Sequence, residues 1–303
     1  ELGIKSGNIV LLENIVDLIA FYLNKNNIES LNEILDKIIS LIDKCIKNKN
    51  CSVSLMTKIF QLISVLYSND NTVKNEKIEN LKIIESININ FKKFSHDYDY
   101  IYSSLNCLVI IIKNNEKLTE ECFKSDLIKN IKIAINNYVK EIPPNYTLII
   151  WKVTEFYYLL LKSKKEMIKT LCELNITSNM VNYLDIYNNK VMPKTEVENA
   201  LNMILKKNET KIIKINYVQE ILMNCINYLN IITTSIEGNN YLSEDTSFNK
   251  CILLVLENEN NDNNFLSLAL QCLCNYFKSE SGQIFLATNI EDIFDLLTNL
   301  QNK

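Results

Sequence analysis

The stretch FLSLALQCLCNYFKSESGQIFLATNIEDIFDLLTNL, residues 265–300, decides the fold class. Its first half is apolar on most faces at helical spacing, and a polar break containing Gly282 follows. A second amphipathic run covers residues 290–300. A helix that is apolar on most faces must be covered by neighbours on more than one side. The stretch therefore predicts two helices that pack on each other and on further helices.

The same layout recurs along the whole chain. Six segments share an apolar helix, a break rich in Asn, Ser and Lys, and a second amphipathic helix. The first helices end near anchors that lie 43, 46, 49, 71 and 45 residues apart, namely Leu23, Leu66, Ile112, Leu161, Ile232 and Phe277. The second helices are expected at 31–45, 78–91, 127–139, 180–187, 248–256 and 290–300. Because sustained two-residue alternation is scarce, we predict an all-α protein.

We expect one repeat domain over residues 1–303. Its units should lie near 8–50, 51–95, 98–142, 146–190, 215–258 and 263–303, with an inserted helix at 195–214. Neither helix of a pair can bury its apolar stripe alone, so stacked pairs must share a continuous core. The chain begins at Glu1 without Met, and its last helix is apolar where solenoids carry polar caps. We therefore expect the domain to be part of a longer chain.

The stretch at 265–300 resembles an armadillo repeat. It matches the family's A-L-x-x-L-x-N…G…I-x-x-L-x-x-L-L skeleton at Ala269, Leu270, Leu273, Asn275, Gly282, Ile290, Ile293, Leu296 and Leu297. We expect the five earlier units to keep the apolar skeleton of this repeat but to lack its glycine. The resemblance implies a right-handed α-solenoid of about six armadillo-like helical repeats, and helix-pair solenoids of the HEAT type share the period of about 40–47 residues.

Two armadillo sub-families can be compared with this sequence. Importin-α-like adaptors carry a Trp and an Asn on successive groove helices, and Trp151 is the only tryptophan here, so that ladder cannot form. Residues 265–300 also resemble the third repeat of PUL domains, with their L-A-L…N-x-F-x-x-x-x-G-x-x-L core. Those modules attach ubiquitin-handling proteins to a hexameric AAA ATPase. This resemblance makes a PUL-like cofactor one alternative function.

Composition excludes several function classes. No glycine lies between Gly7 and Gly238, so that region cannot hold a glycine-rich phosphate loop. All 32 basic residues are lysine, and the net charge of −4 argues against a nucleic-acid partner. The single histidine, His96, provides no histidine-rich metal site. We expect no cofactor and no small-molecule substrate.

Nine cysteines are present without a C-x-x-C pair, and Cys272-x-Cys274 has the wrong spacing for a zinc knuckle. Most lie in apolar runs, where a thiol packs as a small hydrophobe. They predict reduced core cysteines and a reducing compartment. We expect a cytoplasmic protein, and a nuclear location also fits. No apolar run reaches the roughly 18 residues of a membrane span.

Two short motifs could suggest catalysis. His96 is followed by Asp97, Tyr98 and Asp99, but the spacing fits no established triad, and an Asp at the start of a helix serves as a cap. Glu120 and Glu121 precede Cys122, and adjacent carboxylates raise the pKa of a thiol. We therefore assign no catalytic residue and predict a protein that is not an enzyme.

A stacked solenoid exposes one long surface that can bind an extended peptide or a partner helix. We predict an interaction scaffold or adaptor whose groove is lined by polar residues of the second helices. An Asn amide both donates and accepts, so it can hold a peptide backbone. The candidates are Asn88, Asn90, Asn136, Asn137, Lys140, Asn182 and Asn188. Two alternatives stay open: these are ordinary solvated residues of an Asn-rich chain, or the domain is a structural segment of a trafficking, cytoskeletal or motor-associated assembly.

Overall fold

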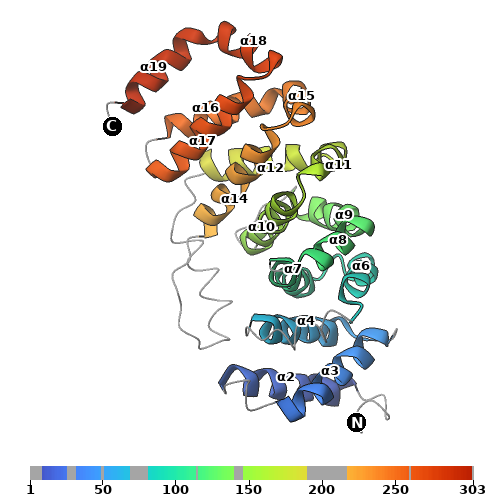
Figure 1. Cartoon of the computed structure of the whole chain (residues 1–303). Helices are drawn as coiled ribbons and strands as arrows, with labels where there is room; N and C mark the ends of the chain where they lie inside the picture. Colours follow the sequence, from blue (N-terminus) through green and yellow to red (C-terminus); the bar gives the residue numbers. More distant parts are fainter. Residues whose placement is uncertain are drawn as a thin grey trace. The chain divides into compact units, whose positions relative to one another are not determined.

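The computed structural model describes residues 9–25, 32–48, 51–68, 81–113, 115–139, 146–189, 217–258 and 261–301. In these ranges the regular structure consists of sixteen α-helices and one 3₁₀ turn, with no strand (Figure 1). The prediction of an all-α protein is confirmed. The inserted helix expected at 195–214 lies outside the described residues. No helix in these ranges is long and apolar enough to cross a membrane.

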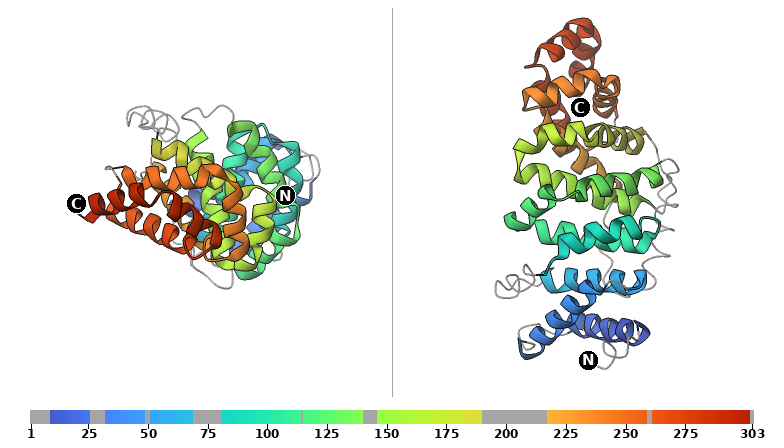
Figure 2. Two further views of the ribbon diagram at one scale, coloured as in Figure 1. Left: turned by 90° about the horizontal axis from the view of Figure 1, so that it is seen from above. Right: turned by 90° about the vertical axis from the view of Figure 1, so that its right-hand side faces the viewer.

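The chain divides into two compact units, Glu1–Glu141 and Ile142–Lys303. In the first unit the first helices pack side by side in the order α2 (Ile9–Lys25), α4 (Val53–Ser68) and α7 (Tyr98–Ile112). A second row follows the order α3 (Asn32–Lys47), α6 (Ile83–Lys93) and α9 (Leu127–Val139), and the short helix α8 (Glu116–Lys124) packs on α6, α7 and α9. Figure 2 shows these helices, blue to green, lying one above another. The core of this unit lies between the two rows.

The second unit contains three rows of helices. The first row is α10 (Thr147–Ser163), α14 (Tyr217–Ile232) and α17 (Asn263–Tyr276). The second helices are α12 (Ile176–Asn189), α16 (Thr246–Glu257) and α19 (Ile290–Gln301), and α12 packs on both α14 and α16. The short helices α11 (Ile168–Glu173), α15 (Ile236–Glu244) and α18 (Glu280–Thr288) pack on one another in that order, and the 3₁₀ turn Lys165–Met167 leads into α11.

Where the structure describes the polar break between a first and a second helix, the break contains a short helix: α8, α11, α15 or α18. Three of these helices begin at an Asn or Ser whose side-chain oxygen accepts a hydrogen bond from the backbone N–H three residues later. The caps are Asn115 in α8, Ser235 in α15 and Ser279 in α18. Asn and Ser are frequent in loops and also are preferred N-caps. The same residues therefore indicated a loop in the sequence and begin a helix in the structure.

A glycine recurs at the start of two of these short helices, which corrects the expectation that the glycine is lost before the last unit. Gly238 in α15 and Gly282 in α18 lie 44 residues apart. A Cβ at Gly238 would lie 2.2 Å from the Ile232 carbonyl oxygen, and a Cβ at Gly282 would lie 2.0 Å from the Tyr276 oxygen. The short helix thus begins directly against the end of the preceding first helix. Only glycine permits this approach without movement of the backbone.

Buried aromatic rings hold the helices of each unit together. In the first unit Tyr100 of α7 makes edge-to-face contacts with Phe60, Phe91 and Phe94, at centroid distances of 5.9, 6.0 and 5.2 Å. Such pairs add roughly 0.5–1.5 kcal/mol each to the burial of their surface. They link α7 to α4, to α6 and to Phe94, the C-cap residue of α6. The apolar periodicity seen in the sequence is therefore the packing surface between rows.

Candidate partner-binding surfaces

The second helices of the first unit carry three of the predicted binding asparagines within the described residues. Asn88 of α6 accepts a hydrogen bond at Oδ1 from Nδ2 of Asn130 in α9, at 2.6 Å. Asn90 donates from Nδ2 to the Ser86 carbonyl oxygen of its own helix, at 2.9 Å. Asn136 of α9 is exposed. Two of the three amides thus already bond within the protein, and Asn136 is the accessible one.

Two further predicted residues cannot be placed. Lys140 and the side chain of Asn137 lie outside the described residues. Their proposed contact with a partner stays a prediction.

In the second unit the two predicted asparagines of α12 differ. Asn182 is exposed. Asn188 is only 8% exposed, and its Oδ1 accepts hydrogen bonds from Nδ2 of both Asn258 and Asn261, each at 3.1 Å. A buried amide with these partners is an internal link between α12 and the end of α16. Asn188 is therefore not a surface residue, in contrast to its expected position in a groove.

A chain of side-chain amides lies on the first helices of the second unit, where the sequence prediction placed no binding residue. Asn275 of α17 donates from Nδ2 to Asn230 Oδ1 of α14 at 3.4 Å, and Asn230 donates to the Leu268 carbonyl oxygen at 3.2 Å. The ammonium group of Lys278 donates to Asn275 Oδ1 at 3.2 Å. We call Asn230, Asn275 and Lys278 the amide chain. Both asparagines are half-buried, and each amide nitrogen keeps a second hydrogen for another acceptor.

The sequence contained a signal for the amide chain. Asn275 is the asparagine of the armadillo-like skeleton, and Asn230 stands near the end of the first helix one repeat earlier. The sequence did not predict that the two asparagines bond to each other. Periodicity shows which residues share one face of a helix, but it does not show which residues of a neighbouring helix they meet.

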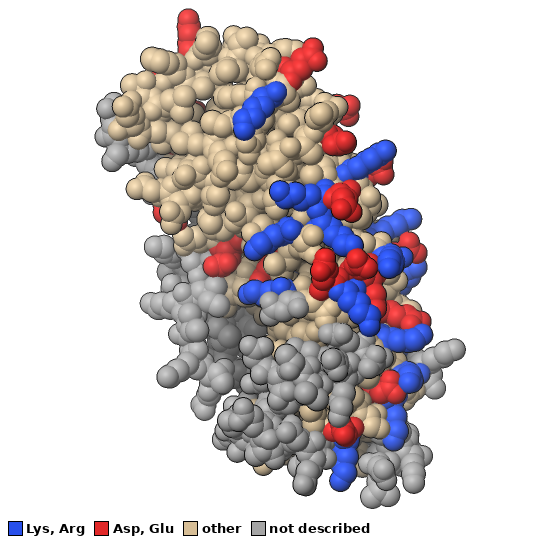
Figure 3. Space-filling model, in the orientation of Figure 1, with Lys and Arg blue, Asp and Glu red and all other residues tan. Residues whose placement is uncertain are grey.

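Charged side chains are unevenly distributed over the face of the molecule seen in Figure 3. Over α16 and α17 this face is mostly tan, with few Lys, Asp or Glu side chains. Charged side chains gather instead near the edge of the view on the side of the short helices and of α9. The side-chain amides of Asn230 and Asn275 can both donate and accept, which suits a peptide backbone.

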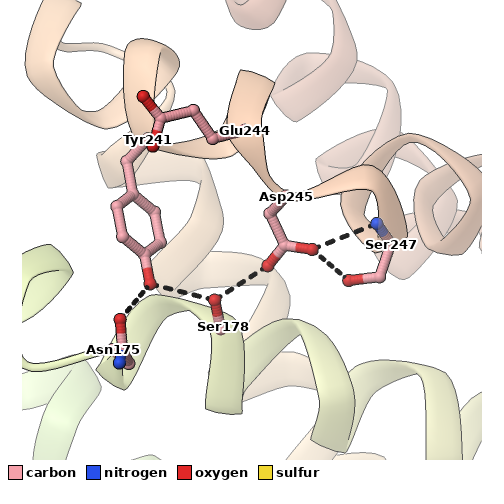
Figure 4. Close-up of a pocket in the computed structure, with 6 residues that line it drawn as sticks. All are labelled: Asn175, Ser178, Tyr241, Glu244, Asp245 and Ser247. Atoms are coloured by element: carbon pink, nitrogen blue, oxygen red, sulfur yellow. Dashed lines mark hydrogen bonds between the residues drawn. The ribbon is translucent and has the colours of Figure 1, made fainter.

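An open hollow of about 460 Å³ lies where α12, α15 and α16 meet (Figure 4). Tyr241 donates to Asn175 Oδ1 at 2.9 Å and lies at the same distance from Ser178 Oγ. Ser178 in turn donates to Asp245 Oδ2 at 2.8 Å, and Asp245 Oδ1 accepts from the backbone N–H of Ser247 at 3.0 Å. Polar side chains of three helices thus form one connected network.

This network has the chemistry of a helix junction. Asp245 is the N-cap of α16, so its carboxylate stabilises the first turn of that helix. Asn175 has a φ of 54°, in the left-handed region, and its side-chain oxygen accepts a hydrogen bond from the Tyr241 hydroxyl. Burial raises the pKa of Tyr241, and the bond to Ser178 opposes that shift. A carboxylate that caps a helix and accepts from a serine holds these helices together, and we assign no reaction to it.

The cysteines behave as the sequence predicts. All nine are free; eight are buried, and Cys274 of α17 is exposed. Burial raises the pKa of the Cys107 thiol to about 12. Burial is also the main cause of the raised pKa of Cys122, and Glu121 raises it further, in the direction expected for an adjacent carboxylate. A thiol held neutral in this way is a poor nucleophile near neutral pH.

The other motif weighed for catalysis is a helix start. Asp97 is the N-cap of α7 and accepts the backbone N–H of Tyr100 at 2.8 Å, while His96 is exposed. The expected capping role of Asp97 is confirmed. Among the residues that the structure describes, no three His, Cys, Asp or Glu side chains lie together in a group that could hold a metal ion.

Neither a protein-family model nor any curated protein matches this chain. The resemblance of residues 265–300 to an armadillo repeat therefore stays a prediction from the sequence.

Proposed function

We propose that this protein is a non-enzymatic scaffold or adaptor that binds an extended segment of a partner protein across α14 and α17. The observation that carries the proposal is the amide chain. Its asparagines join two adjoining first helices and keep amide hydrogens for a further acceptor. A partner's backbone carbonyl oxygens are acceptors of the right kind, and they need no complementary charge.

The packing of the helices also supports this function. In the second unit α10, α14 and α17 adjoin in one row, as expected for armadillo-like repeats stacked into a solenoid. Solenoids of this type bind extended partners along a surface formed by equivalent helices of successive repeats. Asn230 and Asn275 lie near the ends of two such helices.

The second helices offer a competing surface, because Asn136 and Asn182 are exposed there. Asn182 of α12 and Asn275 of α17 belong to the same unit, so substitutions at the two positions can be compared to decide between the two surfaces. Removal of either amide leaves the packed core intact, since one side chain is exposed and the other half-buried.

The test begins with selection of short unstructured peptides from a random library on the full chain, followed by fluorescence anisotropy with the selected peptides. The double substitution Asn230→Ala with Asn275→Ala should weaken binding about tenfold, or about 1.4 kcal/mol. Asn182→Ala should leave binding unchanged. Peptide binding should also protect the Cys274 thiol from alkylation, because Cys274 is exposed beside Asn275 on α17.

Two results would contradict the proposed site. Loss of binding in Asn182→Ala, with the double variant unaffected, would place the surface on the second helices. Failure of the full chain to select any peptide, under conditions in which it is folded and monomeric, would favour a structural segment of a larger assembly.

A further inference from the structure

The last helix presents a second apolar face that the packing of its unit does not cover. Ile290, Phe294 and Leu297 of α19 are 58, 68 and 44% exposed. Their spacing of four and three residues places them on one face of the helix. We call these three residues the outer stripe.

The other face of α19 anchors the helix. Ile293 and Leu296 are only 2 and 9% exposed, and α19 packs on α18. The outer stripe therefore belongs to a helix that is held in place, and its exposure is not that of a frayed end. Anchors at positions i, i+4 and i+7 are the pattern by which one helix recognises another.

Negative charge borders the outer stripe. Glu291 and Asp295 each follow a stripe residue directly, which places them beside it because consecutive residues turn by about 100° around the helix. Asp292 is exposed on the same helix. Between Lys278 and Lys303 the chain contains no lysine and no arginine. Nothing on this helix thus offsets the carboxylates.

This combination selects among occupants. A second copy docked through the same face would bring the carboxylates of two α19 helices together, which is unfavourable at an interface core. A membrane surface rich in anionic lipid would be repelled for the same reason. A helix with an apolar stripe flanked by Lys or Arg would bury the outer stripe and complement Glu291 and Asp295.

We propose that the outer stripe of α19 is a docking site for a basic amphipathic helix of a partner protein. The apolar side chains contribute most of the affinity through burial, and the carboxylates select the partner and orient it. Binding at this site is separate from peptide binding by the amide chain, which lies on α14 and α17.

The first experiment measures binding of a defined probe to the full chain. The probe is a fluorescent helical peptide with Leu at positions i, i+3, i+4 and i+7 and Lys on both flanks. Phe294→Asp should weaken its binding at least about tenfold. Leu18→Asp is the matched control, because Leu18 of α2 is 69% exposed and Phe294 is 68% exposed. The control should bind the probe like the unsubstituted protein.

A charge exchange tests the partner chemistry. The double substitution Glu291→Lys with Asp295→Lys should weaken the Lys-flanked probe and strengthen a second probe in which every Lys is replaced by Glu. Equal binding of both probes to the unsubstituted protein would reduce the site to nonspecific apolar adhesion and overturn the proposal. Binding that is unchanged by Phe294→Asp would also overturn it.

Two further measurements test the occupants rejected above, which are a second copy of the chain and an anionic membrane surface. Sedimentation equilibrium should show no dimer that Phe294→Asp disrupts, and vesicles of phosphatidylcholine and phosphatidylserine should not bind the protein through Phe294. A positive result in either would replace the proposed partner. The amide-chain variant Asn230→Ala with Asn275→Ala should bind the Lys-flanked probe normally, so failure of one proposal can be distinguished from failure of the other.

Discussion

The turn between α7 and α8 in the first unit and the turn between α17 and α18 in the second make the same connection with different residues. In each, the N-cap lies three residues beyond the end of the first helix and accepts a backbone N–H from three residues further on. The bond from Leu118 to Asn115 is 2.9 Å, and the bond from Gly282 to Ser279 is 3.1 Å. A fully buried leucine thus occupies the place that a glycine occupies in the other turn.

The difference begins at the N-cap. Asn115 has a ψ of 100°, whereas Ser235 and Ser279 have ψ values of 151° and 157°. At Ser279 the short helix begins so close to the first helix that an added Cβ would meet the Tyr276 oxygen at 2.0 Å. At Asn115 there is room for a side chain that enters the core. One capping bond therefore serves both a tight turn that needs glycine and a turn that buries an apolar residue.

The largest expected effect comes from the leucine turn. Leu118→Ala should destabilise the protein by about 2–5 kcal/mol, because it removes a fully buried side chain and leaves a cavity. Unfolding of the first unit can be followed by denaturant-dependent alkylation of Cys122, which lies one helical turn away. Lys117→Ala, at an exposed position, should change stability by less than about 0.5 kcal/mol. A loss as small as that control would show that Leu118 is not part of the core.

A side chain added at the glycine of the second turn should lower the stability of the second unit. Gly282→Ala should destabilise the second unit by about 1–3 kcal/mol, since the backbone must move to admit the Cβ. Gly238→Ala should behave alike. Alkylation of buried Cys272 in denaturant reports on this unit, and Gln283→Ala is the neighbouring exposed control. Alanine is the better helix former by about 1 kcal/mol, so a stabilised Gly282→Ala variant would refute the close approach.

Substitution of an N-cap residue should lower stability by less than the substitutions at Leu118 and Gly282. Ser279→Ala removes one capping bond and should cost about 1 kcal/mol. Asn115→Ala should cost more, because Asn115 also donates from Nδ2 to the Tyr67 hydroxyl at 3.0 Å. Asn115→Ser keeps the cap and loses the link to Tyr67, so its stability should lie between those of the native protein and Asn115→Ala. Equal stability of the two Asn115 variants in denaturant unfolding would show that Ser does not replace Asn as the cap.

The substitution with the smallest expected effect on stability at neutral pH removes a buried tyrosine hydroxyl, whose effect appears only at high pH. Burial raises the pKa of Tyr187 in the second unit from 10.0 to about 12, and that of Cys45 in the first unit from 9.0 to about 11. The folded state then holds a proton that the unfolded state has lost, so this stability is complete below the unfolded pKa and declines as pH rises toward the folded value. Tyr187→Phe should weaken the decline in denaturant midpoint between about pH 10 and 12. Tyr22→Phe, at an exposed position, should not; equal slopes in all three proteins would contradict the burial of Tyr187.

Helix positions were predictable because periodicity is a local property. The run expected at 127–139 is α9 (Leu127–Val139), and the run expected at 290–300 is α19 (Ile290–Gln301). The short helices were missed because Asn115, Ser235 and Ser279 have the composition of loops. The match of Gly238 to Gly282 could have been found in the sequence, since both lie three residues after a Ser that follows an apolar helix.

The candidate site was less predictable, since it depends on which amides meet. Asn188 and Asn182 stand on one helix, yet only Asn188 meets Asn258 and Asn261, some 70 residues later. Asn230 and Asn275 are separated by 45 residues and bond across two helices. No pattern within one helix distinguishes an amide that bonds internally from one that can hold a partner.

The sequence by itself determined the helical class, the repeated layout and the absence of a glycine-rich phosphate loop between Gly7 and Gly238, since these follow from residue identity and spacing of three or four. Only the tertiary structure decided that Asn188 is buried and that Phe294 stays exposed. It also decided that Leu118 occupies the position in its turn that Gly282 occupies in the turn before α18. The physical reason is that exposure and side-chain pairing depend on the neighbouring helix, which comes from a distant part of the sequence.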